Sequence, residues 1–437
     1  MKLNLMVRIV ALAGFFVLLT RPLPAQPLQR LSLKDAYARL EANYPVLQNA
    51  ALLTEIHEKE QAGLDKARLP AVYLKADGRA QTQSTQLQVE EGFPLPFEIN
   101  QPLVSAKAYL EAQYVILDGG MTKAQREMKS LQLQADQQDL EVDRFALRER
   151  VNQLCLGALL LREQSKLFDI SLEDLRVRKE SVAAAVENGV ALPSELARLE
   201  VKELEIRGQQ DNLAYKLRGT LETLSHLIGA ELAPEVEFVL PALGNAGEIP
   251  ELDRPEQRLL MVQKASLLAH TQMIDAARRP KLSAYAQAGT GYPNPLNILD
   301  NDIAPYGLVG AQFSFQITDW KKSRLDKEIV GLQARKLDHA EEAFEFNMAS
   351  REASYIAEVE RLQSQLLQDE RIARLQADIL QQLAAQLDEG VITSAEYVTQ
   401  VNAELKARQN LLVHQTQLLQ TQLDFWNERG GNPSNTK

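Results

Sequence analysis

Few side chains in this sequence have the types and spacing of a reaction centre. The five histidines are scattered, and His57-Glu58 lacks the second histidine of a zinc-binding helix motif. Cys155 is the only cysteine, so a disulfide framework or a cysteine-rich zinc site is excluded. Gly119-Gly120 lacks the spacing of a nucleotide-binding fingerprint. We therefore predict that the protein is not an enzyme, with no catalytic residue, cofactor or metal, and that Cys155 packs among leucines.

Two glutamates stand in matching surroundings and could act together electrostatically. Glu195 follows Gly189 by six residues, and Glu396 follows Gly390 by six. Each glycine ends a long helical pattern and can take the left-handed conformation that closes a helix. Carboxylates brought close together can attract cations. A glutamate in the first turn of a helix can also simply favour the helix dipole, and the residues alone leave both interpretations open.

Helix-capping residues follow both glycines. Val190 and Val391 come directly after them, and then Ser194, and Thr393 or Ser394, can cap the next helix. Each segment therefore predicts the tip of a helical hairpin.

These tips belong to a large internal repeat. The landmarks of the first half are Pro45, Pro70, Asp118 and Gly189, and those of the second are Pro255, Pro280, Asp319 and Gly390. Both proline pairs are 25 residues apart, and both Asp-to-Gly distances are 71 residues. A repeat of this length is far above solenoid periods, so it indicates duplication of a large half.

Each half combines short strands with one very long helix. Apolar and polar residues alternate over 71–79, 110–116, 281–289 and 309–317, which predicts four strands with one apolar face each. Residues 120–188 and 319–389 contain no proline and are rich in strong helix formers. The strands suit a membrane-spanning sheet in length, although a small soluble sheet packed on helices would also alternate.

The N-terminus and the composition indicate export. The basic residues Lys2 and Arg8 precede an apolar run over 9–19. Cleavage after Ala25 would complete a secretory signal peptide over 1–25. The formal charge of the whole chain is −11, which disfavours nucleic-acid binding. No later stretch is long and apolar enough for a transmembrane helix.

The order of these elements resembles the TolC-like outer membrane efflux proteins. The resemblance rests on the opening LSLKDAYARLEANYPVLQNA, the ARLP and ARRP junctions, LDGGMTKAQR and the two glycine tips, and it covers about residues 28–428. It implies a mainly α fold with a small transmembrane β part, built from a duplicated strand pair and long helix hairpin. Three copies would form a 12-stranded β-barrel in the outer membrane, continued by a periplasmic α-barrel.

The resemblance also divides the chain into segments. The expected segments are 1–25 signal peptide; 26–69 N-terminal equatorial and periplasmic helices; 70–118 first transmembrane strand pair and extracellular loop; 119–231 first helical hairpin; 232–253 linker; 254–279 second-repeat helix; 280–318 second strand pair and loop; 319–428 second helical hairpin; and 429–437 tail.

The function implied by the resemblance is an exit duct of a tripartite efflux or type I secretion system. The expected partners are two further copies in a homotrimer, a periplasmic adaptor (membrane fusion protein), an inner-membrane pump and outer-membrane lipid. The expected docking and aperture residues at the tips are Gly189, Val190, Ser194, Glu195, Gly390, Val391, Thr393 and Glu396. Ile392 stands where the family can have a basic residue, which argues against a salt bridge there. The alternative is a periplasmic coiled-coil adaptor or scaffold, which would need a compact domain of many short strands.

Overall fold

The structure, a computed structural model, describes residues 27–83, 101–240, 252–297 and 299–430. The predicted signal peptide, most of the first strand-to-strand loop, part of the predicted linker and most of the predicted tail lie outside these residues. The chain forms two compact units. The first takes residues 1–49, 140–256 and 344–437, and the second takes 50–139 and 257–343, so both halves of the sequence contribute to each.

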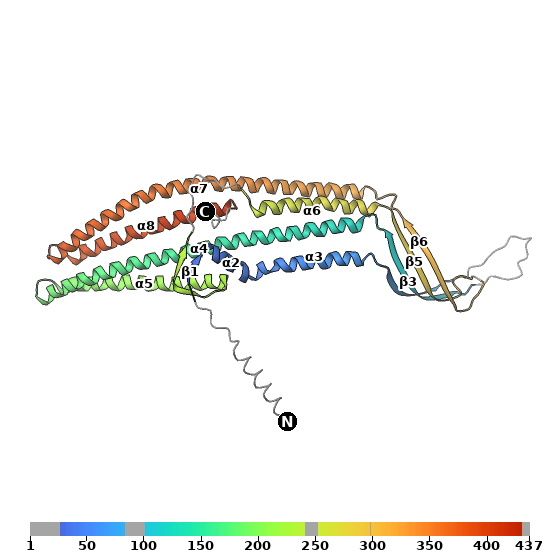
Figure 1. Cartoon of the computed structure of the whole chain (residues 1–437), viewed down its shortest axis with the longest axis horizontal. Helices are drawn as coiled ribbons and strands as arrows, with labels where there is room; N and C mark the ends of the chain where they lie inside the picture. Colours follow the sequence, from blue (N-terminus) through green and yellow to red (C-terminus); the bar gives the residue numbers. More distant parts are fainter. Residues whose placement is uncertain (1–26, 84–100, 241–251, 298, 431–437) are drawn as a thin grey trace, which may run out of the picture. The chain divides into compact units, whose positions relative to one another are not determined.

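The helices and strands that the sequence predicts follow one another in the predicted order, and β1, η1 and β4 are additional (Figure 1). They are β1 (Leu28–Ser32), α2 (Leu33–Asn43), the 3₁₀ helix η1 (Pro45–Gln48), α3 (Asn49–Lys66), β2 (Ala71–Ala80), β3 (Val104–Leu117), α4 (Met121–Glu187), α5 (Pro193–Ile228), β4 (Leu232–Val239), α6 (Pro255–Arg278), β5 (Lys281–Tyr292), β6 (Ala304–Ser314), α7 (Lys322–Asp388) and α8 (Ser394–Glu428). The long helices α4 and α7 have 67 residues each, as the repeat requires.

The second unit contains a four-stranded antiparallel sheet in the order β2-β3-β5-β6. One row of paired residues crosses the four strands in the order Val72, Ala112, Ala286 and Val309. Because side chains alternate along a strand, these four residues share one face, and all are apolar. Val72 and Val309 are 67% and 84% exposed, so that face is left uncovered by the part of the chain that the structure describes.

The opposite face of the sheet is polar. Glu111 of β3 accepts hydrogen bonds from Lys75 of β2 at 2.6 Å and from Gln287 of β5 at 2.7 Å. These three side chains therefore form one network across neighbouring strands. The predicted division of each strand into an apolar and a polar face is confirmed for the sheet as a whole.

The start of each long helix is built alike in the two halves. The carboxylate of Asp118 accepts hydrogen bonds from the backbone amides of the second and fourth residues after it, at 2.8 and 2.7 Å. Asp319 accepts the matching pair, both at 3.1 Å. The Gly-Gly pair after Asp118 has φ values of 72° and 88°, and the Trp-Lys pair after Asp319 has 51° and 69°. The second copy thus keeps the turn at a cost in backbone strain that glycine avoids.

The first unit contains two strands that the sequence did not predict. β1 and β4 pair in parallel, and β4 occupies Leu232–Val239, within the segment predicted as a linker. Ser32 caps α2 by accepting a hydrogen bond from the amide of Asp35 at 3.1 Å. The hydroxyl of the buried Tyr37 on α2 donates to Asn152 of α4 at 2.5 Å.

Cys155 lies in the hydrophobic core of this unit. Its side chain is 1% exposed, and burial raises the pKa of the thiol to about 12. The expectation that this cysteine packs rather than reacts is confirmed. The same core joins β1 and α2 to α4, α5 and β4.

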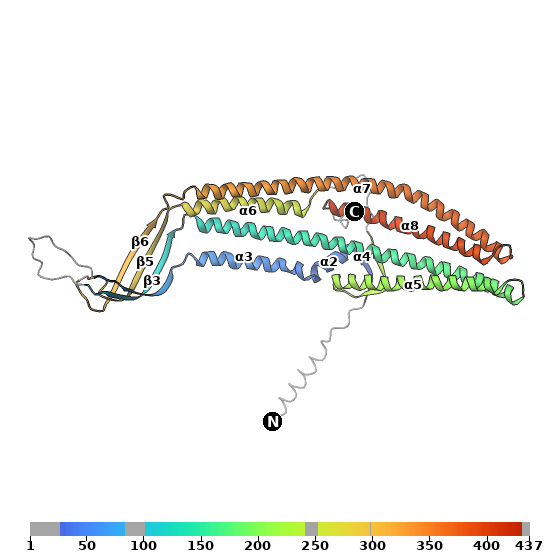
Figure 2. The ribbon, with the colours of Figure 1, turned by 180° about the vertical axis from the view of Figure 1, so that it is seen from behind.

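In the first unit the hairpin α4–α5 lies beside the hairpin α7–α8, as both views show (Figures 1 and 2). A second hydrophobic core joins all four helices. It contains Phe168, Leu175, Val182, Leu199, Ile206, Ala384, Leu387, Tyr397, Val401 and Leu405. Phe168, Leu175 and Val182 of α4 are spaced seven residues apart, and so are Leu199 and Ile206 of α5. This spacing is typical of coiled-coil packing. Among the described residues, no helix combines the length and hydropathy needed to cross a bilayer.

Candidate functional site: the hairpin tips

Both long helices end in the same hydrogen-bonded motif. Gly189, with φ of 75°, donates its amide to Val186 at 3.0 Å, and the amide of Val190 donates to Ala185 at 2.8 Å. Gly390, with φ of 72°, and the residue after it make the matching pair of bonds at 3.0 and 2.8 Å. This is a Schellman motif, in which a left-handed residue satisfies the last helix carbonyls. The predicted role of both glycines in closing the helices is confirmed.

The two return helices begin differently. Thr393 caps α8 in a full capping box, because its side chain accepts from the amide of Glu396 and the Glu396 carboxylate accepts from the amide of Thr393 at 3.0 Å. The prediction that Ser194 caps α5 is wrong. Leu192 takes the cap position of α5 without a side-chain hydrogen bond, and Pro193 fills the first helical position. Proline has no backbone amide that would need a partner at the first helical position, so the helix starts at the residue before the serine.

This difference predicts unequal effects of two small substitutions. We expect Thr393→Ala to destabilise the first turn of α8 by about 1 kcal/mol, since the capping hydrogen bond is lost. Hydrogen exchange of the amides of that turn would measure the effect. Ser194→Ala is the matched control and should leave exchange at the start of α5 unchanged. Equal exchange in wild type and Thr393→Ala would contradict the capping assignment.

Glu195 connects the first tip to the second. Its carboxylate accepts a hydrogen bond from the backbone amide of Ser394, at 2.7 Å, and Ser394 is fully buried. Glu195 thereby satisfies an amide at the start of α8, in a helix of the other half. Together with the capping box at Glu396, this means that both predicted glutamates accept hydrogen bonds from backbone amides at one helix start.

The turns themselves present apolar side chains to solvent. Val190, Leu192 and Val391 are 79%, 68% and 68% exposed. These three exposed aliphatic residues lie on two turns that the Glu195–Ser394 hydrogen bond joins, and together they form a small apolar surface. Such surfaces commonly mark protein interaction sites.

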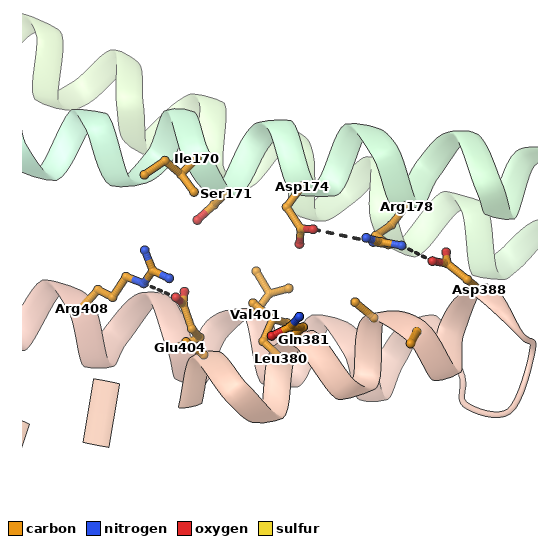
Figure 3. Close-up of a pocket in the computed structure, with 13 residues that line it drawn as sticks. Ile170, Ser171, Asp174, Arg178, Leu380, Gln381, Asp388, Val401, Glu404 and Arg408 are labelled. Atoms are coloured by element: carbon orange, nitrogen blue, oxygen red, sulfur yellow. Dashed lines mark hydrogen bonds and ion pairs between the residues drawn. The ribbon is translucent and has the colours of Figure 1, made fainter. Parts of the chain in front are cut away.

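Behind the tips, charged residues of α4, α7 and α8 line a cavity of about 460 Å³ (Figure 3). Arg178 of α4 makes an ion pair with Asp388 at the end of α7 and lies 3.6 Å from Asp174. The hydroxyl of Tyr397 on α8 donates to Asp174. Asp174 and Arg178 both lie on α4, whereas the ion pair with Asp388 and the hydrogen bond from Tyr397 each join α4 to a helix of the second half. These two contacts hold the two hairpins together.

Burial shapes the titration of this cluster. Desolvation, and then the neighbouring Asp174 carboxylate, raise the pKa of the Tyr397 hydroxyl well above its usual value. Burial also raises the pKa of Glu404, which lines the same cavity, and Arg408 partly offsets this effect. Tyr397 therefore remains a neutral donor to Asp174 across the physiological range.

Sequence reasoning missed these residues, although the repeat carries a signal for them. At the offset of 201 residues, Asp174, Arg178 and Tyr397 correspond to Leu375, Ile379 and Leu196. A polar residue whose repeat mate is aliphatic marks a contact that the two halves do not share. The structure brings these three unmatched residues together, whereas the sequence alone gives no reason to pair them.

The comparisons with known proteins place this fold among channels. No family model and no curated protein matches the sequence. Solved structures match it over nearly the whole chain. CusC, whose structures describe transmembrane channel formation, matches with a TM-score of 0.69 and 14% identity, over 95% of this chain and 96% of the other.

Two further similar structures are outer membrane proteins of named bacteria. The outer membrane protein VceC from Vibrio cholerae has a TM-score of 0.67 and 12% identity, over 92% of this chain and 96% of that one. The MtrE outer membrane channel from Neisseria gonorrhoeae has a TM-score of 0.66 and 16% identity, over 91% and 89%. The chain has the fold of the TolC-like outer membrane channels, which confirms the fold class predicted from the sequence.

Proposed function

We propose that this protein is the outer-membrane exit duct of a tripartite efflux or type I secretion system. The observation that carries the proposal is the two-faced sheet, within a fold shared over nine tenths of the chain with outer membrane channels. One face of the sheet is apolar and exposed, and the other carries the network around Glu111. A lipid-facing surface and a polar lumen are the two environments that such a sheet fits.

The open edges of the sheet support a homotrimer. Among the described residues, β2 pairs only with β3, and β6 pairs only with β5. An unpaired edge cannot remain exposed in hydrocarbon, and single membrane barrels have at least eight strands. Three copies joined edge to edge would give the 12 strands that the family resemblance implies. The long helices of the three copies would then surround the periplasmic part of the duct.

The tips supply the surface for the other components. We assign adaptor docking to the apolar turns around Val190 and Val391, with an inner-membrane pump delivering the substrate. The tip glutamates are assigned to the periplasmic aperture. Binding, rather than catalysis, is the role of every residue in this scheme, and the structural neighbours are channel proteins.

Reconstitution tests the proposal directly. The protein, extracted from outer membranes and added to planar lipid bilayers, should give discrete single-channel conductance steps of uniform size. The same preparation, heated until the trimer dissociates, is the control and should give none. Bilayers that stay silent after insertion of intact trimer would contradict a duct.

The aperture assignment predicts a change in ion selectivity. Glu195→Gln with Glu396→Gln removes six charges from a trimer, while each glutamine oxygen can still accept the backbone hydrogen bond. The tips should therefore keep the same geometry, and the channel should lose its cation preference because the local negative potential falls. Reversal potentials in a KCl gradient would measure this. Unchanged cation selectivity in the double variant would mean that the glutamates lie away from the ion path.

A further inference from the structure

The turn between β6 and α7 holds an exposed tryptophan on a strained backbone. Trp320 is 90% exposed, and its φ value of 51° lies in the left-handed region that disfavours residues with a side chain. Its repeat mate at the offset of 201 is Gly119, which takes a left-handed conformation without that strain. The second half therefore keeps a large apolar side chain where the backbone favours glycine. Strain retained at an exposed position points to a function for the side chain.

Within the chain, the matching turn packs against the junction between α6 and β5. A Cβ atom added to Gly119 would lie 2.7 Å from the carbonyl oxygen of Ala276 and 2.9 Å from the Cβ of Arg279. The Arg279 guanidinium also donates to the carbonyl of Gly119 at 3.5 Å. This contact forms where β3, which ends before the turn, lies beside β5, which begins after the junction.

The junction between α3 and β2 has the same local structure but lacks such a contact. The amide of Leu69 donates to the carbonyl of Lys66 at 3.0 Å, as the amide of Arg279 does to that of Ala276 at 3.2 Å. A proline follows each junction, and Leu69 corresponds to Arg279 at the repeat offset of 210. Leu69 is 64% exposed, so the described part of the chain leaves this side chain largely uncovered.

The two edges of the sheet would bring the exposed tryptophan and the exposed leucine together in a trimer. β6 ends before the tryptophan, β2 begins after the leucine, and these are the edge strands. Subunits joined edge to edge would pair β6 with the β2 of a neighbour, as β3 pairs with β5 within the chain. Shifted by the repeat offsets, the Ala112–Ala286 pairing places Phe313 opposite Ala76 of the neighbouring subunit. Both residues lie on the apolar face, so this register keeps the two faces aligned, whereas a slip of one residue would not.

We infer that Trp320 of each subunit packs on Leu69 of the neighbouring subunit, an inference that rests on the proposed trimer. The contact between Gly119 and Arg279 within the chain is thereby replaced by an apolar contact between subunits. Each of the two exposed side chains covers the other, and this burial offsets the backbone strain at the tryptophan. Because an indole ring is large, it lies along the neighbour's junction and does not approach that backbone as closely as glycine does. The contact fixes the pairing of β6 with β2 at the end of the sheet nearest the helices.

Disulfide crosslinking between subunits tests the inference. The equivalent positions within the chain bring two Cβ atoms close together, and a disulfide joins Cβ atoms about 3.5–4.5 Å apart. Trp320→Cys with Leu69→Cys should therefore link neighbouring subunits under mild oxidation. Heated samples should show linked chains on electrophoresis, which a reductant converts to single chains. Trp320→Cys with Leu52→Cys is the matched control, since Leu52 is also exposed on α3 but lies about four turns before its end. The native Cys155 is buried, so the wild-type protein should stay unlinked.

The rate of trimer dissociation gives a second, independent measurement. We expect Trp320→Gly to relieve the backbone strain and yet to speed dissociation in detergent by about a hundredfold. A departing subunit breaks two such contacts, and the loss of each large apolar contact is worth a factor of about ten. Trp320→Phe keeps an aromatic ring and should dissociate much more slowly than the glycine variant. Leu69→Ala should add little to Trp320→Gly, because the two residues act through one contact.

Three outcomes would overturn the inference. The cysteine pair could link no better than its control in an intact trimer, Trp320→Gly could dissociate at the wild-type rate, or the effects of Trp320→Gly and Leu69→Ala could add in full. If the cysteine variant does not assemble, the dissociation rates alone decide. A wild-type protein that never forms a trimer would instead refute the proposed function itself.

Discussion

Val309→Arg is expected to keep the protein out of the outer membrane, while Leu308→Arg is tolerated. Val309 lies in the middle of β6 on the apolar face, with 84% of its side chain exposed. An arginine on the lipid face of a membrane barrel costs about 2–4 kcal/mol near the bilayer midplane. A trimer repeats that cost three times, so the total is on the order of 10 kcal/mol.

The neighbouring residue is a close control. Leu308 lies opposite Gln287, on the face that carries the polar network around Glu111, so its side chain points to the other side of the sheet. Arginine there would face the aqueous lumen. Density-gradient fractionation and electrophoresis with and without heating would compare the two variants. Outer-membrane Val309→Arg trimer at the wild-type level would contradict the assignment of the apolar face to lipid.

Valine at both tip glycines is expected to abolish adaptor docking without affecting assembly. Gly189 and Gly390 hold φ values of 75° and 72°, which cost a side-chain-bearing residue about 1–2 kcal/mol each. An added Cβ meets no atom within 4 Å at either position, so the effect comes from the backbone alone. The turns should adopt another conformation and displace the exposed Val190 and Val391. Docking that needs both native turns should weaken by roughly thirtyfold or more.

In-cell crosslinking to the adaptor and pump-dependent drug resistance would measure that loss. Gly208→Val is the matched control, because Gly208 lies within α5, has no positive φ and also has open space around an added Cβ. The double variant should still form an outer-membrane trimer, since the sheet belongs to the other compact unit. Wild-type crosslinking and resistance in the double variant would refute tip docking.

Local patterns in the sequence predicted most of the fold. The glycines after Asn188 and Glu389 located the ends of α4 and α7 within a residue or two, because a left-handed glycine is a local requirement. The strands were found through alternation. The pair β1 and β4 was missed because the strands are short, β4 contains Pro234, and the pairing joins segments about 200 residues apart.

At the hairpin tips, too, the local contacts could be predicted from the sequence and the contacts between the two halves could not. The capping box at Thr393 depends on residues three apart and could be predicted, although the sequence left Thr393 and Ser394 open as alternatives. The bond from Ser394 to Glu195 joins the two halves, and so does the contact of Tyr397 with Asp174. No local pattern encodes such contacts, which depend on how the hairpins pack.

The central claim, that three copies form a duct in the outer membrane, is tested most directly by the mass and location of the native protein. We predict that the full-length chain, expressed in a Gram-negative host, is extracted from the outer membrane by detergent as a complex with the mass of three chains. Heating should convert this complex to single chains on electrophoresis. A soluble periplasmic monomer would contradict the account and favour a scaffold or adaptor instead.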